Sequence, residues 1–155
     1  MHVRTGSLYT IKTTKIAGKF YRYMRTKYGD KPMAVVGSMK CGGRYNVAGL
    51  FGALYLGFDR ETCETEVSQG IAAGVRFKNG VFTAWEYDVE LADITIQGNH
   101  WTASGISEHL HKRGDIEGLV APSAQHKGGL CLDVYLDRIR TRSHVTPKTN
   151  LGTWP

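Results

Sequence analysis

An arginine stands among glycines in the segment GGRYNVAG, residues 42–49. Glycine loses much backbone entropy on folding, so it is used where a chain turns sharply or approaches another group closely. The planar guanidinium of Arg44 can bind a phosphate or a carboxylate through two parallel hydrogen bonds. The alternative is a loop with a solvated arginine, and a motif this short leaves both readings open.

Two glutamates flank the apolar side of a helix that the segment DRETCETEVSQGIAAG, residues 59–74, predicts. Asp59 is of a residue type that caps helices, and the segment ends on a glycine. At about 100° per residue, Glu64 and Glu66 lie on opposite sides of the apolar stripe that starts at Cys63. Either carboxylate can lie at the edge of a cleft, although such residues usually form a solvated helix face. Periodicity does not choose between them.

A serine and two histidines are further candidates. Ser123 follows a short predicted strand, GLVAP, in a loop that contains glycine, and loops at strand ends often carry functional residues. A turn serine that binds the local backbone is the alternative. His109 and His111 are two residues apart on a predicted helix, roughly 200° around its axis, so they do not share a metal ion.

Cysteine spacing, apolar runs and net charge limit the class of protein and the kind of partner. Three cysteines form no CxxC pair, so neither a zinc site nor a disulfide framework is indicated, and a reducing cytosol fits. The polar opening MHVRTGSLYT is unlike a signal peptide, and no apolar run approaches the roughly 20 residues of a membrane span. The net charge of +6 permits a nucleic acid, a nucleotide or an acidic protein as partner. The segment KFYRYMRTKY, residues 19–28, can bind single strands, but we favour a half-buried segment because no nucleic-acid motif accompanies it.

The elements that must position these residues are mixed strands and helices without a regular βαβ order, which predicts an α+β fold in one domain. The strand candidates are residues 7–13, 33–36, 53–58, 81–91, 94–97, 118–122 and 130–139. The helix candidates are residues 17–28, 59–74 and 104–114. The tail, residues 141–155, contains Pro147, Gly152 and Pro155 and predicts irregular structure.

Three blocks of the chain resemble the RES domain, a family named for its Arg, Glu and Ser. The segment GGRYNVAGLFGALYLGFDRETCETEV resembles the central motif, which runs Gly-Gly-Arg-aromatic-Asn, a small loop, Leu-Tyr-Leu and a helix. EYDVELADIT and DIEGLVAPSAQHKGGLCLDVYLDRI resemble later blocks and come in the same order. The resemblance covers about residues 8–140 and implies a single RES-like domain within residues 1–155.

RES proteins are typically toxins of bacterial toxin–antitoxin pairs, whose antitoxin carries an Xre-like DNA-binding domain. The resemblance implies a compact fold similar to ADP-ribosyltransferases, with a split or mixed sheet and short flanking helices. It implies NAD as the substrate, no cofactor and no metal, and cleavage of the nicotinamide–ribose bond by water or phosphate. It also implies action in the cytoplasm, of the producing cell or of a cell that receives the toxin. A membrane partner is not implied, and a homo-oligomer is left open.

The resemblance also selects residues by position. It chooses Glu66 over Glu64. The catalytic set is Arg44, Tyr55 and Glu66, and the substrate-binding set adds Tyr45, Asn46 and Ser123 to Arg44.

The residue types suit the chemistry. Glu66 would stabilise the oxocarbenium-like cation that forms when the nicotinamide–ribose bond breaks. Arg44 would hold the pyrophosphate, and Tyr55 would stack on the cationic nicotinamide ring. Ser123 would bind the ribose or the carboxamide. Attachment of ADP-ribose to a protein or nucleic acid, and a basic binding module without catalysis, are the alternatives.

The chain departs from the family pattern in its first strand. Many members have an arginine where this chain has Thr10, and Arg22 or Arg25 is the candidate to replace it in space. The loop after Asn46 also lacks the usual proline. These departures leave open a divergent member that binds NAD without turning it over.

Overall fold

The computed structural model describes residues 11–72, 81–96 and 103–155. The described chain is a mixture of strands and helices, which confirms the α+β class. The strands are β1 (Thr14–Arg25), β2 (Leu54–Gly57), β3 (Phe82–Ile96), β4 (Gly118–Pro122), β5 (Leu130–Val134) and β6 (His144–Trp154). The helices are α2 (Val36–Cys41), α3 (Arg60–Ala72) and α4 (Ala103–Arg113), with 3-10 turns η1 (Thr26–Tyr28) and η2 (Leu136–Arg138). No helix in these ranges is long and apolar enough to cross a membrane.

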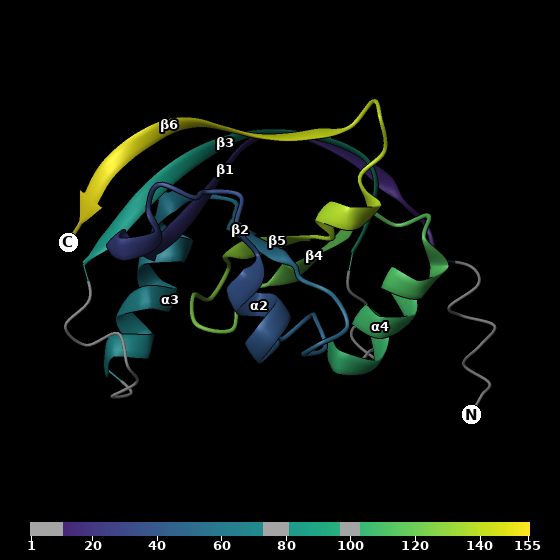
Figure 1. Cartoon of the computed structure of the whole chain (residues 1–155), viewed down its shortest axis with the longest axis horizontal. Helices are drawn as coiled ribbons and strands as arrows, with labels where there is room; N and C mark the ends of the chain where they lie inside the picture. Colours follow the sequence, from purple (N-terminus) through teal and green to yellow (C-terminus); the bar gives the residue numbers. More distant parts are fainter. Residues whose placement is uncertain (1–10, 73–80, 97–102) are drawn as a thin grey trace.

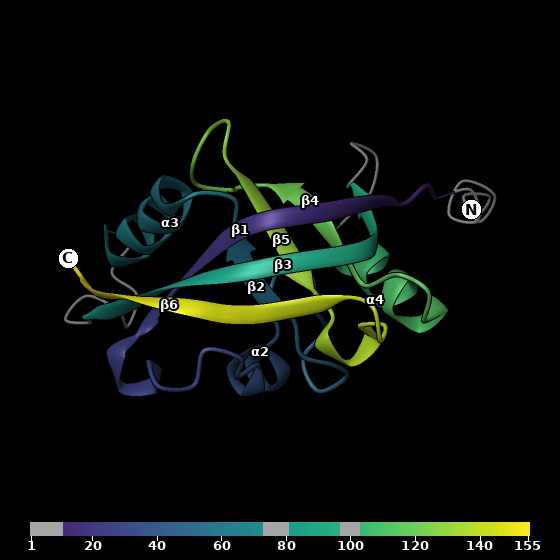
Figure 2. The ribbon, with the colours of Figure 1, turned by 90° about the horizontal axis from the view of Figure 1, so that it is seen from above.

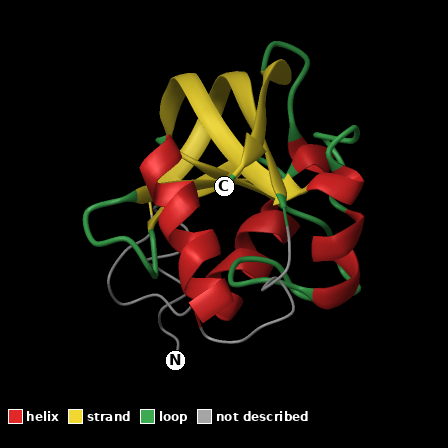
Figure 3. Ribbon diagram, turned by 90° about the vertical axis from the view of Figure 1, so that its left-hand side faces the viewer, coloured by secondary structure: helices red, strands yellow, loops and turns green. Residues whose placement is uncertain are grey.

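Five strands close into a ring. The sheet order is β1-β2-β5-β4-β3-β6, and β1 also pairs with β3, so that only β6 lies outside the closure. The pair β3–β4 is parallel and the other pairs are antiparallel. Figure 1 shows β1, β3 and β6 as an upper layer over β2, β5 and β4, and Figure 2 shows the two layers crossing at a steep angle. The helices lie on the side of the lower layer (Figure 3).

Side-chain alternation along the lower strands divides the core into two clusters. Leu132 and Val134 of β5 belong to the cluster between the layers. Tyr135, directly after β5, belongs to the second cluster, which includes residues of α4. Because neighbouring strand residues point to opposite faces, Asp133 lies on the outer face with Tyr135. Tyr55 of β2 pairs directly with Asp133 of β5, so the side chains of Tyr55 and Asp133 lie on the same outer face.

Several predicted elements are confirmed. The strands expected near residues 53–58 and 118–122 are β2 and β4, and the expected helices at 59–74 and 104–114 are α3 and α4. The two strands expected at 81–91 and 94–97 form one strand, β3. The cap of α3 is also as expected, because the backbone N–H of Thr62 donates to Asp59 Oδ1 at 2.8 Å. The expected stop at Gly74 lies outside the described residues.

Two predicted elements have the wrong type. Residues 17–28, expected as a helix, form most of β1, because the strand pairs with β3 from Ile16 to Arg25. The four-residue spacing of buried Phe20 and Met24 suits a helix, but it also places both on one face of a strand. Residues 33–36, expected as a strand, lead into α2. For residues 17–28, the deciding factor is pairing with a distant strand, which a local pattern does not contain.

The tail and the segment 130–139 also need correction. Residues 141–155, expected to be irregular, contain β6, which pairs with β3 along its length. Pro147 is tolerated because β6 is an edge strand, and the register shifts on either side of Glu86 absorb the irregular spacing. The strand at 130–139 ends at Val134 and continues as η2. The expected strand at 7–13 lies mostly outside the described residues, and residues 11–13 are not in a strand.

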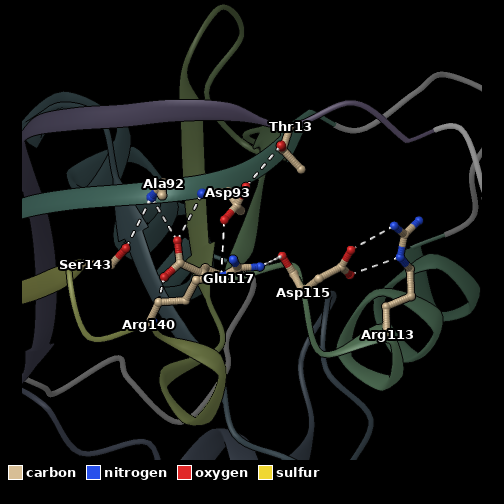
Figure 4. Close-up of polar contacts among 8 residues, drawn as sticks. All are labelled: Thr13, Ala92, Asp93, Arg113, Asp115, Glu117, Arg140 and Ser143. Atoms are coloured by element: carbon tan, nitrogen blue, oxygen red, sulfur yellow. Dashed lines mark hydrogen bonds and ion pairs between the residues drawn. The ribbon is translucent and has the colours of Figure 1, made fainter.

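A buried carboxylate joins four segments at the start of β4 (Figure 4). Glu117 is fully buried, and its Oε1 accepts hydrogen bonds from the backbone N–H of Ala92 at 2.8 Å and of Asp93 at 3.0 Å. Its Oε2 accepts from the backbone N–H of Arg140 at 2.8 Å. Burial alone would raise the pKa of Glu117, but these hydrogen bonds, with one from Ser143, outweigh it and hold the pKa below its ordinary value. The carboxylate therefore stays ionised while buried.

Candidate active site

A cavity of about 630 Å³ opens on the outer face of β2 and β5, between α3, β1 and the 42–45 segment. It brings together residues that are up to 111 positions apart in the sequence, from Arg22 to Asp133. Its polar and ionisable lining residues are Arg22, Tyr23, Ser38, Arg44, Tyr45, Tyr55, Thr62, Cys63, Glu66, Gln125, Cys131 and Asp133. Among the predicted site residues, Arg44, Tyr45, Tyr55 and Glu66 thus line one cavity.

Glu66 is half-buried and held by two neighbours. The hydroxyl of Ser123 donates to Glu66 Oε2 at 2.6 Å, and the thiol of Cys131 donates to the same oxygen at 3.5 Å. Among the described residues, Oε1 has no hydrogen-bond partner. The carboxylate is therefore oriented through one oxygen, and the other is left for a ligand.

Ser123 does not itself line the cavity. Its contacts combine the two alternatives from the sequence, a serine of the functional site and a turn serine. Its Oγ accepts from the backbone N–H of His126 at 3.1 Å, as a turn serine does, and at the same time it donates to Glu66. The turn fixes the hydroxyl, and the hydroxyl fixes the carboxylate. Ser123 is therefore a positioning residue for Glu66.

Glu64, which the helical pattern could not distinguish from Glu66, is directed elsewhere. It accepts a hydrogen bond from the hydroxyl of Tyr23 at 2.5 Å and pairs with Arg60. Burial, together with the hydrogen bond to Glu64, raises the pKa of Tyr23 to about 12. Glu64 does not line the cavity, but Tyr23 does. The structure thus separates the two glutamates by their surroundings.

The glycines of the 42–45 segment permit a close approach. Gly42 has φ +72°, in the left-handed region that favours glycine. A Cβ on Gly43 would lie 2.4 Å from the hydroxyl of Tyr55, so no side chain fits without moving the tyrosine. The next residue, Arg44, is exposed at the cavity, with its guanidinium 5.4 Å from the ring centroid of Tyr45. Among the described residues Arg44 has no ion-pair partner, so its charge is available to an anion.

Asn46 holds this loop against Tyr55. Its side-chain amide donates to the carbonyls of Ser38 at 2.8 Å and Phe51 at 2.9 Å. Its Oδ1 accepts from the hydroxyl of Tyr55 at 2.5 Å, and that hydroxyl accepts from the backbone N–H of Tyr45 at 3.1 Å. Burial raises the pKa of Tyr55 above its ordinary value. Asn46, predicted to bind substrate, is buried and does not line the cavity, so its observed contacts are those of a positioning residue.

A Gly43→Ala substitution is expected to disturb the site more than the fold. The added methyl group displaces the Tyr55 ring or breaks its bond to Asn46, which costs about 1–3 kcal/mol. The melting temperature should fall by several degrees, and ligand binding in the cavity should weaken. Gly37→Ala in α2 is the matched control for stability, because its Cβ meets nothing within 4 Å. It should leave the melting temperature unchanged or raise it. A Gly43→Ala protein as stable as wild type would contradict the close packing.

Of the two arginines predicted to replace the family's first-strand arginine, Arg22 and Arg25, only Arg22 lines the cavity. Arg22 lines the cavity, and one of its nitrogens donates to the carbonyl of Pro32 at 2.9 Å. Arg25, at the end of β1, is not among the lining residues. Thr10 lies outside the described residues.

Sequence reasoning missed Asp133. It is 1% exposed, lines the cavity, and has no hydrogen-bond partner on either oxygen among the described residues. A signal was present in the segment LCLDVYL, where an acidic residue falls within a strand rich in apolar residues. Only the pairing of β5 with β2 and β4 on both sides shows that this strand is central and that the acid is buried.

The fold and the cavity define a small α+β domain with an ionisable site on the outer face of a closed sheet. The chain belongs to the RES domain family, whose model matches residues 19–151. A chain of the crystal structure of the M. tuberculosis MbcT–MbcA toxin–antitoxin complex has a similar fold, with a TM-score of 0.70. The comparison covers 98% of this chain and 92% of that chain at 17% sequence identity, which shows likeness of fold alone. A search of curated proteins finds no match.

Proposed function

We propose that this protein is the toxin of a toxin–antitoxin pair and that it cleaves the nicotinamide–ribose bond of NAD. The observation that carries the proposal is the shared cavity. It gathers the arginine, tyrosine and glutamate that the RES resemblance selects, with the serine holding the glutamate. The similar fold of a chain from a toxin–antitoxin complex supports the toxin assignment. From the shared cavity and the RES resemblance, we also propose that the protein binds NAD as ADP-ribosyltransferases do.

Glu66 is the central group of the proposed reaction. Breakage of the nicotinamide–ribose bond gives the ribose an oxocarbenium-like charge, which a fixed carboxylate stabilises. Ser123 and Cys131 hold Oε2, so Oε1 can face the ribose without a rearrangement of the side chain. The electron pair of the broken bond leaves with neutral nicotinamide, and water or phosphate attacks the ribose carbon. A phosphate acceptor gives ADP-ribose 1″-phosphate, and water gives ADP-ribose.

Arg44 and Tyr55 would bind the two ends of the substrate. Arg44 is exposed and unpaired among the described residues, so its guanidinium can hold the pyrophosphate through two hydrogen bonds. The hydroxyl of Tyr55 is already bonded to Asn46 and Tyr45, so the tyrosine offers its ring rather than its hydroxyl. A cationic nicotinamide ring stacked on it gains a cation–π attraction that is lost when the ring becomes neutral and leaves.

The proposed partner is a cognate antitoxin with an Xre-like domain. The net charge of +6 favours association with an acidic segment, which could cover the cavity and exclude NAD. The proposed place of action is the cytoplasm, either of the producing cell or of a cell that receives the toxin.

The test is incubation of the purified protein with NAD, followed by chromatography of nicotinamide. Release that depends on phosphate would identify a phosphorylase, and release without phosphate would identify a glycohydrolase. Release only after addition of a cell extract, with radiolabel from the adenylate half appearing on macromolecules, would support the transferase instead. No release and no label transfer under these conditions would overturn NAD cleavage.

A further inference from the structure

The floor of the cavity contains a carboxyl group that the proposed reaction does not use. Asp133 is 1% exposed, and neither carboxyl oxygen has a hydrogen-bond partner among the described residues. A buried polar group without a partner costs free energy, so its persistence calls for an explanation. Because Asp133 also lines the cavity, the missing partner can be part of a bound ligand.

The surroundings decide the charge of this group. Burial is the largest effect on Asp133, followed by the nearby carboxylate of Glu66 on α3, and both raise its pKa well above the ordinary value. Arg44 acts in the opposite direction and does not outweigh them. The other titratable neighbours, Tyr55 on β2 and Tyr135 and Cys131 of the β5 region, all have raised pKa values and carry no charge at neutral pH. Burial and Glu66 thus favour the neutral, protonated form of Asp133.

A protonated carboxyl group has one donor and one acceptor side by side. A primary carboxamide has the complementary pair, because its N–H donates to the carboxyl C=O and its carbonyl accepts from the carboxyl O–H. An ionised carboxylate would lose the donor. The chemistry of a neutral Asp133 therefore matches an uncharged amide better than a cation or an anion.

The strand register places this group beside the ring platform. Asp133 and Tyr55 are direct partners across the β5–β2 pair, so their Cα atoms are about 4.5–5.5 Å apart and their side chains share the cavity face. Glu66 approaches the same region from α3, as its effect on Asp133 shows. A flat ring stacked on Tyr55, with its bond to ribose near Glu66, would carry its substituent to Asp133.

We propose that Asp133 is a specificity-determining residue that binds the carboxamide of the nicotinamide ring through paired hydrogen bonds. The proposal deepens the proposed function, since it rests on NAD as the substrate. It explains the unpartnered buried carboxyl group and gives the cavity a means to reject related molecules. Nicotinic acid and its dinucleotide carry a carboxylate in place of the carboxamide, and this anion would lie next to Glu66 and lose the matched pair.

The test uses binding of the leaving group, which does not require cleavage. Calorimetry at pH 7 would compare nicotinamide with nicotinate on wild type, Asp133→Asn and Asp133→Leu. Wild type should bind nicotinamide at least tenfold more tightly than nicotinate. Asp133→Asn keeps one donor and one acceptor and should stay within about threefold of wild type, whereas Asp133→Leu should lose about tenfold or more. Asp137→Asn, an exposed carboxyl change beyond β5 and outside the cavity lining, is the matched control.

A second readout follows the protonation state directly. Infrared spectra of wild type at pH 7 should contain a protonated-carboxyl C=O band that Asp133→Asn lacks and Asp137→Asn retains. Unchanged nicotinamide affinity in Asp133→Leu, no binding to wild type, or no such band would overturn the proposal. If Asp133→Leu does not fold, the selectivity of wild type and the behaviour of Asp133→Asn still decide it. Nicotinamide binding without NAD cleavage would overturn the proposed function while leaving this site in place.

Discussion

A Glu66→Gln protein is expected to release nicotinamide from NAD roughly 10²–10³-fold more slowly than wild type. Glutamine keeps an oxygen that can accept from Ser123, so the side chain should stay in place. It removes the negative charge that stabilises the cation at the ribose, so the loss should fall on kcat rather than on KM. Steady-state kinetics of nicotinamide release would measure both constants.

Glu61→Gln is the matched control for this substitution. Glu61 is on the same helix, its side chain is 77% exposed, and its Oε1 lies 3.7 Å from Nε2 of His126. It does not line the cavity, so its kinetics should equal those of wild type. Equal loss of rate in both variants would indicate an effect of helix charge. Full activity in Glu66→Gln would remove Glu66 from the mechanism.

A Glu117→Ala protein is expected to lose about 3 kcal/mol or more of unfolding free energy at pH 7. The substitution removes the carboxylate that accepts from three backbone N–H groups, those of Ala92, Asp93 and Arg140. It also removes the side-chain hydrogen bonds that link the start of β4 to β3 and to the segment before β6. Urea denaturation monitored by tryptophan fluorescence would measure the change. The exposed Glu108→Gln, which loses only a surface pair with Lys112, should stay within about 0.5 kcal/mol of wild type.

The same carboxylate sets a pH dependence. The pKa of Glu117 is lower in the folded protein than the ordinary value of about 4.3 in an unfolded chain. Ionised Glu117 therefore stabilises the fold above that pH, and its contribution is lost as the pH falls through the folded-state pKa. Glu117→Gln does not titrate, so its stability difference from wild type should narrow below about pH 4. A constant difference from pH 3 to 7 would contradict an ionised buried Glu117.

Local patterns predicted the parts of the fold that local contacts decide. The cap at Asp59 lies within the segment that it starts, and the buried strand around Leu56 is apolar in itself. By contrast, Phe20 and Met24 fit a helix and a strand equally well, and only pairing with β3 decides between them. Pro147 predicts an irregular tail unless one knows that its strand lies at an edge.

The site residues also divide into those that the sequence predicted and those that only the structure identifies. The resemblance placed Glu66, Arg44 and Tyr55, which the structure brings to one cavity, but residue patterns alone could not separate Glu66 from Glu64. That separation comes from Ser123, which arrives from a loop 57 positions away. Asp133 was missed because its burial depends on two neighbouring strands rather than on its own segment.

The closed ring of strands also bears on when this protein becomes dangerous to the cell that makes it, if it is the proposed toxin. β5 lies between β2 and β4 in the ring, yet residues 130–134 are translated long after β2, residues 54–57. Until they leave the ribosome, the ring cannot close and the cavity has no floor. A chain terminated before β5 would lack Asp133 and the strand that joins β2 to β4, so we expect it to have no assembled cavity and no toxicity.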